Sequence, residues 1–138
     1  MAVQFWVDAN KKQIQPDLFS TAAETLAKQI NKERDREINE ATQIRKFYDE
    51  VLRFDGLVRA NPDEFNTLLP YLKMLNAKAT YALGRKLISQ NFKNFITESI
   101  SQIQTQKDFE VFRDFFEAFI GFYRYYGEQN QERRGGMR

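Results

Sequence analysis

The chain has 138 residues, the length of one domain with a substantial hydrophobic core. It contains no Cys and no His, so it lacks disulfides, thiolate chemistry and the usual imidazole base and metal ligand. Its formal net charge is +2, from 21 basic and 19 acidic residues, so affinity for a polyanion would depend on where the charges lie. These counts disfavour an enzyme, and we expect no catalytic residue, no cofactor and no metal site.

The start of the chain carries no basic region followed by an apolar run, and no uncharged apolar stretch of about 18 residues occurs. We therefore expect a soluble, cytoplasmic protein without membrane contact. Aromatic residues make up 14% of the chain and 13 residues are Phe, whereas Gly and Pro are few. This composition is typical of packed helices, and the fold class predicted is all-α.

Residues 5–14 form two short apolar pieces around a turn, closed by Pro16, which predicts an extended arm or a small hairpin. Apolar residues then recur with helical spacing from about Asp17 to Ile30. Residues 32–40 are dominated by charge of both signs. We expect the first helix to end or fray near residues 35–39.

A second helix is predicted from about Asn39 to the residue before Pro62, because its apolar residues fall on one face. Asn61 followed by Pro62 has the order of an N-cap and a first-turn proline, so a third helical region begins there. Pro70 either kinks this helix or separates a short helix (residues 63–69) from a longer one (residues 70–87). We favour the separation, because Pro70 also suits a first-turn position.

A further helix is predicted over residues 91–104, and the last from about Asp108, a possible cap, to Tyr126. This last helix is apolar over most of its circumference, so it is buried either at the centre of its own bundle or partly in another subunit. Gly127 is expected to stop it. The predicted organisation is a compact bundle of about five to six helices over residues 1–127, with the arm at 1–16 and a disordered Arg/Gly tail at 128–138.

The basic residues are unevenly placed. No acidic residue occurs between Glu64 and Glu98, and Lys78 and Arg85 in that stretch are two helical turns apart with Tyr81 between them. A face that alternates cation, aromatic ring and cation suits a sugar-phosphate backbone and its bases. A basic helical face is also ordinary solvated surface, and both interpretations stay open.

Three further residues have two interpretations each. Tyr81 and Trp6 could each stack a nucleic-acid base, although both residue types are more often packing residues. Glu117 could be a functional carboxylate, but it has no partner carboxylate or metal motif in the sequence, so an ion-pair role is favoured.

Three segments together point to a family: TQIRKFYDEV at residues 42–51, LLPYLKMLNAKATYALGR at 68–85 and FFEAFIGFYRYY at 115–126. In this order the chain resembles the small subunit of type III-A CRISPR effector complexes, the second Csm subunit, over nearly its whole length. The resemblance implies a helical bundle that stacks in several copies as an inner filament, beside the guide RNA and its single-stranded target RNA. It also implies no catalytic role, association with the other Csm subunits, and self-association into a filament or dimer in antiviral defence.

The family's basic motif positions fall on Arg45, Lys46 and Arg85. The local charge argument adds Arg53, Lys78 and Lys86 to the predicted RNA-binding residues. Family members often place Lys immediately before the proline of the central segment, where this chain has Leu69, so a contact from that turn is in doubt. The competing hypothesis is a helical adaptor that contacts no nucleic acid and binds an acidic protein partner through the same basic residues.

Overall fold

The computed structural model describes residues 3–8, 10 and 13–136, with side chains to Gln129. Its elements are a π-helical turn Leu18–Ala22, then α1 Ala23–Lys32, α2 Ala41–Ala60, a 3-10 turn Pro62–Glu64, α3 Phe65–Lys73, α4 Leu75–Gly84, α5 Gln90–Ser101 and α6 Gln106–Gly136. The prediction of an all-α bundle is confirmed.

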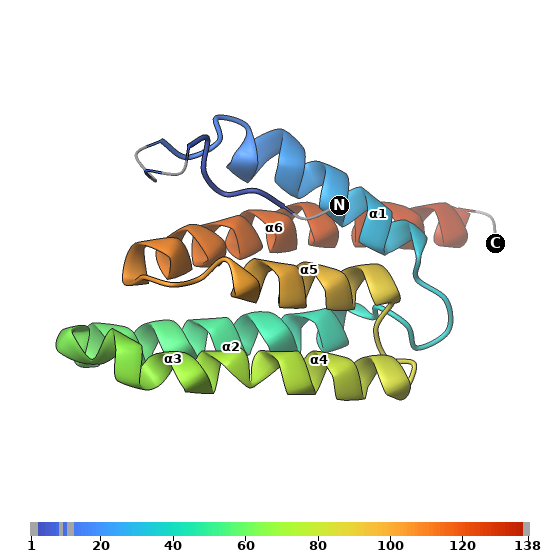
Figure 1. Ribbon diagram of the computed structural model, residues 1–138. Helices are drawn as coiled ribbons and strands as arrows, with labels where there is room; N and C mark the ends of the chain where they lie inside the picture. The colour runs from blue at the N-terminus through green and yellow to red at the C-terminus, as the bar shows by residue number, and fades with distance from the viewer. Residues whose placement is uncertain (1–2, 9, 11–12, 137–138) are drawn as a thin grey trace.

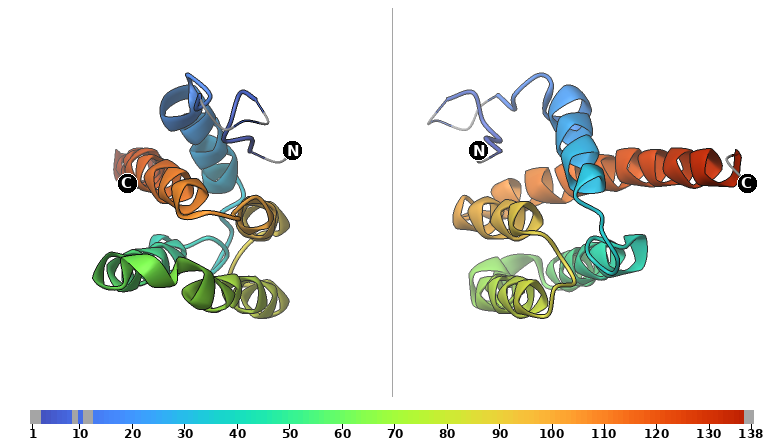
Figure 2. Two further views of the ribbon diagram at one scale, coloured as in Figure 1. Left: turned by 60° about the vertical axis from the view of Figure 1, so that its left-hand side comes forward. Right: turned by 90° about the vertical axis from the view of Figure 1, so that its right-hand side faces the viewer.

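The helices form three layers (Figures 1 and 2). α1 lies at one side, α5 and α6 form the middle layer, and α2 lies beside α3 and α4 at the other side. α6 packs against both α1 and α2, and α4 packs against α5. One side of α2 and of the α3–α4 pair is therefore left toward solvent.

The N-terminal segment is a small hairpin, which decides between the two predicted alternatives. The N–H of Val7 donates to the carbonyl of Gln13, and the N–H of Gln15 donates to that of Phe5, both at 2.9 Å. Phe5 is fully buried in the core. The tip of the hairpin falls partly on residues 9, 11 and 12, outside the described residues.

The indole of Trp6 fixes this hairpin to α6. Its Nε1–H donates to the buried carboxylate of Asp108 at 2.9 Å. The same carboxylate accepts the N–H of Thr105 at 3.1 Å, while the Thr105 hydroxyl accepts the N–H of Asp108 at 3.2 Å. This reciprocal capping box starts α6 at Gln106, so Asp108 takes part in the cap as expected but lies inside the helix.

Asn39 joins the segments on either side of the predicted loop at residues 35–39. It is fully buried and has a positive φ of 62°, which Asn tolerates better than most residues. Its amide group donates to the Ile30 carbonyl at 3.2 Å and to the Ser89 hydroxyl at 3.0 Å, and its oxygen accepts the Ser89 N–H at 2.9 Å. Its own carbonyl accepts the Tyr123 hydroxyl of α6. One residue thus ties the end of α1 to α6 and to the loop before α5.

The predicted position of the break within the third helical region is wrong. Pro70 lies inside α3, and the break between α3 and α4 falls at Met74. The carbonyl that loses its partner at Pro70 belongs to Asn66, an exposed residue that water can reach, so the helix tolerates the proline. Asn61 lies at the N-cap position of the 3-10 turn with Pro62 in its first turn, as predicted, but its side chain makes no capping hydrogen bond there. Its amide instead donates to the Leu57 carbonyl at the end of α2 at 2.9 Å.

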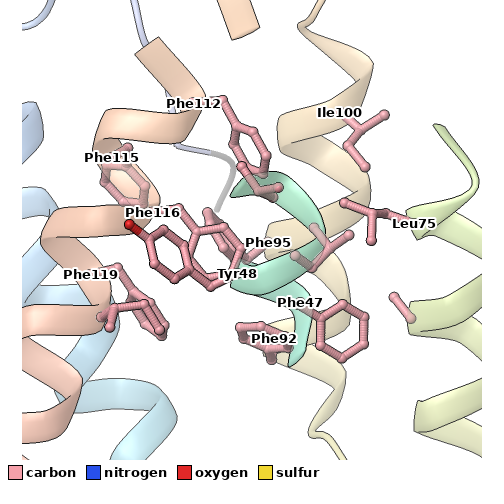
Figure 3. Packing of buried hydrophobic residues seen from close by; sticks show 14 of the residues in the cluster. Phe47, Tyr48, Leu75, Phe92, Phe95, Ile100, Phe112, Phe115, Phe116 and Phe119 are labelled. Atoms are coloured by element: carbon pink, nitrogen blue, oxygen red, sulfur yellow. The ribbon is translucent and has the colours of Figure 1, made fainter. Parts of the chain in front are cut away.

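The aromatic helix α6 lies at the centre of its own bundle, as the first of the two predicted alternatives required. The rings of Phe112, Phe116 and Phe119 are fully buried. Phe95 of α5 packs against all three, with ring centroids 5.4 to 6.0 Å apart (Figure 3). Phe92 and Tyr48 close this cluster from α5 and α2.

The prediction that α6 ends at Gly127 is wrong, because the helix continues to Gly136. Gly127 instead allows a close approach: a Cβ at this position would lie 3.2 Å from Nη1 of Arg34. One glycine inside a helix costs about 1 kcal/mol relative to Ala, too little to stop a helix that good helix formers continue.

Candidate nucleic-acid interface

A cluster of three charges joins α2 to α4. Glu50 of α2 pairs with Arg53 on the same helix at 3.0 Å and with Lys78 of α4 at 3.3 Å. The hydrogen bond from Arg53 is the largest cause of a pKa of Glu50 below its usual value, and Lys78 adds to it against the opposing effect of burial. The cluster therefore places two cations together at one point of the surface.

Two hollows open on either side of the Glu50–Lys78 pair. One, of about 300 Å³, lies between α2 and α3 and is bounded by Leu57 and Tyr71. The other, of about 450 Å³, lies between α2 and α4 and is bounded by Phe47 and Tyr81. We refer to both together as the α2–α4 groove, lined along its length by Lys46, Glu50, Arg53, Tyr71, Met74, Lys78 and Tyr81.

Arg85 holds the ring of Tyr81 at one end of this groove. Its Nη1 donates to the Tyr81 hydroxyl at 3.1 Å, and its guanidinium carbon lies 5.7 Å from the ring centroid. This hydrogen bond is the largest cause of a raised Arg85 pKa. This contact leaves 66% of Tyr81 exposed.

The predicted RNA-binding residues therefore divide into four at the α2–α4 groove and two, Lys86 and Arg45, outside it. Lys46, Arg53 and Lys78 line the α2–α4 groove, with Arg85 beside them. Lys86 is exposed just beyond the end of α4, where its φ is 62°.

Arg45 lies apart from the groove. Its Nε pairs with Asp49 at 3.1 Å, and its guanidinium lies over the Tyr48 ring at 5.2 Å. It lines another hollow together with Arg124 and Tyr123 of α6. The structure thus separates Arg45 from Lys46, its neighbour in sequence, because adjacent residues on a helix point about 100° apart.

Sequence reasoning missed two residues of the groove, Tyr71 and Met74. They are 66% and 55% exposed, a high value for such large side chains. Positions 71, 74, 78, 81 and 85 alternate spacings of three and four, which places them on one face of a helix. That spacing was the available signal, but sequence alone does not say whether such a face is buried.

The structure also bears on the residues that had two interpretations. Trp6 packs: its N–H is used by Asp108, and Lys107 lies 5.5 Å from its ring centroid. Tyr81 stays exposed and available. Glu117 is exposed, and the described residues give it no ion-pair partner.

The part of the chain that the structure describes contains neither a cluster of metal-binding side chains nor a membrane-spanning helix. No group of three or more acidic side chains lies close enough together to hold a metal ion there. None of the described helices has both the length and the apolar character needed to cross a membrane.

The fold and the groove define the chain as an all-α helical bundle with cations and tyrosines gathered along one surface groove. Residues 13–129 match the family described as Csm2 Type III-A, which covers most of the chain. The chain therefore belongs to this family of subunits of type III-A CRISPR effector complexes. No curated protein and no solved structure matches the chain significantly.

Proposed function

We propose that this chain is a non-catalytic RNA-binding subunit of a type III-A effector complex, which holds guide and target RNA without reading their sequence. The observation that carries the proposal is the gathering of Lys46, Arg53 and Lys78 along one groove, with Arg85 at its end. Family membership supports the setting, since such a complex contains RNA and other Csm subunits with which this chain would associate.

The proposed mechanism is electrostatic. Lys and Arg side chains contact phosphates and 2′-hydroxyls, and each neutralised phosphate releases counterions, so affinity falls with added salt. Because one subunit offers few such cations, it binds RNA weakly. Self-association into a filament or dimer then provides useful affinity by repeating the groove along the strand.

The same proposal places the chain in the cytoplasm, in antiviral defence, as one helical domain. The boundary predicted for this domain at residue 127 falls within α6, which continues to Gly136. It assigns catalysis to other subunits and needs no cofactor. Arg45 and Lys86 are included as outer contacts, reached by RNA that extends beyond the groove.

The test is fluorescence anisotropy of a labelled single-stranded RNA of mixed sequence, over a range of salt concentrations and at protein concentrations high enough for self-association. The test variant is Lys46→Gln with Arg85→Gln, and the matched control is Lys28→Gln with Arg59→Gln, two exposed cations outside the groove. The test variant should bind more weakly and lower the slope of log K against log salt by about 1.4, since each phosphate contact contributes about 0.7. Equal loss in both variants would show that only overall charge matters.

The alternative function is a protein adaptor whose groove binds an acidic partner. The exposed Tyr71 and Met74 favour it, because such side chains are common in protein interfaces. An acidic peptide added to the same titration separates the two functions. Displacement of RNA by the peptide at low concentration, together with absent RNA binding at moderate salt, would favour the adaptor.

A further inference from the structure

The side of α3 and α4 that faces solvent carries an aromatic and cationic stripe. Tyr71, Met74, Lys78, Tyr81 and Arg85 form it and are all exposed. At about 100° per residue they fall within a sector of about 80° around the helix axis. α4 follows α3 end to end, and Met74 between them keeps helical backbone angles (φ −62°, ψ −17°) (Figure 1). The stripe is therefore one continuous feature.

Each tyrosine of the stripe borders one of the two hollows of the α2–α4 groove. Tyr71 borders the hollow that Leu57 and Leu68 line, and Tyr81 borders the one that Phe47 and Leu87 line. Phe54, Leu57, Leu68, Leu72 and Leu75 line the first hollow, and Phe47, Ala82 and Leu87 line part of the second, so both offer apolar surface to the flat face of a ring.

Cations line the same hollows. Arg53 and Lys78 border the first and Lys46 and Lys78 the second. A flat apolar face with a cation at its rim matches a nucleotide, which joins an aromatic base to a phosphate. The α3–α4 side of the groove carries no acidic residue between Glu64 and Glu98, and the acidic residues of the groove, Asp49 and Glu50, lie on α2.

The order of side chains along the stripe favours a nucleic-acid strand over a protein helix. A protein helix that packed along the stripe would need apolar residues repeating every seven positions. At that spacing the stripe has Tyr71 followed by the cations Lys78 and Arg85. At about 1.5 Å per residue, the two tyrosines lie about 15 Å apart along the helix. A stacked strand covers that distance with about four nucleotides at about 3.4 Å each.

We propose that the α2–α4 groove receives unpaired RNA bases, one stacked on Tyr71 and one on Tyr81, while Lys46, Arg53, Lys78 and Arg85 contact the intervening phosphates. This inference rests on the proposed function and adds the form of RNA that the groove selects. A base held inside a continuous duplex presents no free face, so the groove discriminates against uninterrupted double-stranded RNA. It remains tolerant of sequence, because every base has an aromatic face.

The experiment compares three RNA probes of equal length: a single strand, the same strand with abasic sites throughout its centre, and a blunt duplex. Wild type should bind the base-bearing strand about 30-fold more tightly than the abasic strand, from about 1 kcal/mol of stacking at each of two rings. The variant Tyr71→Leu with Tyr81→Leu should lose this preference and keep the salt dependence. Tyr125→Leu, at an exposed tyrosine of α6 outside the groove, should retain it, and circular dichroism checks that each variant is folded.

The possible failures are distinguishable. Wild type that binds the single strand but shows no preference over the abasic strand would overturn the stacking inference and leave the proposed function standing. A preference that survives the double substitution would overturn the assignment to Tyr71 and Tyr81. Absence of binding to all three probes, with binding of an acidic peptide in its place, would overturn both proposals.

Discussion

The carboxylate of Asp108 is the point at which one substitution should separate the N-terminal hairpin from the bundle. It is fully buried, and among the described residues it accepts hydrogen bonds from Trp6 Nε1 at 2.9 Å and from the backbone N–H groups of Gln104 and Thr105 at 3.0 and 3.1 Å. A hydrogen bond to a charged group contributes about 1.5 to 3 kcal/mol. Water can replace part of this at Gln104 and Thr105, which are exposed. We expect Asp108→Ala to lower the free energy of unfolding by about 2 to 4 kcal/mol.

The assay uses two signals. Urea denaturation followed by far-ultraviolet circular dichroism gives the change in stability. Trp6 is the only tryptophan, so its fluorescence reports on the hairpin. In Asp108→Ala the emission of the folded protein should shift to the red while the helical signal persists.

Two control variants isolate the cause. Glu117→Ala removes an exposed carboxylate from the same helix and should change stability by less than about 0.5 kcal/mol. Trp6→Phe keeps an aromatic ring but removes the N–H, and a double-mutant cycle with Asp108→Ala should give a coupling of about 1 kcal/mol or more. A stability loss below about 0.5 kcal/mol in Asp108→Ala, with unchanged Trp6 emission, would refute this account of the hairpin.

Three further predictions concern the groove, the core and alkaline pH. Glu50→Gln should tighten RNA binding, because the substitution frees Arg53 and Lys78 from their ion pairs. Fluorescence anisotropy with labelled RNA at low salt would measure the change in affinity. Weaker binding would contradict the proposed role of these cations. Phe95→Ala should cost about 3 to 5 kcal/mol in urea denaturation, as for other large buried rings, and a loss under about 1 kcal/mol would show that the core closes over the cavity. Burial raises the pKa of Tyr123, so above about pH 10 the folded state keeps a proton that the unfolded state releases, and the free energy of unfolding should fall as pH rises. Urea denaturation at several alkaline pH values would measure this fall, which should be smaller in Tyr123→Phe. The same dependence of stability on pH in both proteins would refute the assignment to Tyr123.

The helices were the most predictable part of the fold, because their apolar spacing reflects which face is buried. α5, predicted over residues 91–104, spans Gln90–Ser101, and α2, predicted from about Asn39, spans Ala41–Ala60. The interruption at Pro70 was misplaced because a helix can continue through a proline where the carbonyl that loses its partner is exposed to water, as at Asn66. Asn61 lies at the predicted N-cap position, but its side chain bonds to the helix before it and makes no cap for the turn after it, a choice that the sequence does not determine.

The candidate site was only partly predictable. The excess of positive charge between Glu64 and Glu98 is visible in the sequence, whereas the pairing of Lys78 with Glu50 depends on how α4 packs against α2. The exposure of Tyr71 also depends on how the helices pack. Its residue type favours burial, and only the positions of α2 and α5 determine that its face of the helix is left uncovered.

The hydrogen bonds of Asn39 have a consequence for the rates of folding and unfolding. Its partners Ser89 and Tyr123 are 50 and 84 positions away along the chain, far beyond the local contacts from which helical bundles gain their speed. Such bonds form only after the long intervening loops have closed, so they belong to the last stage of folding. A substitution at Asn39 should leave the folding rate nearly unchanged and accelerate unfolding. Asn39 would then affect how long the subunit stays folded more than it affects how fast the subunit folds.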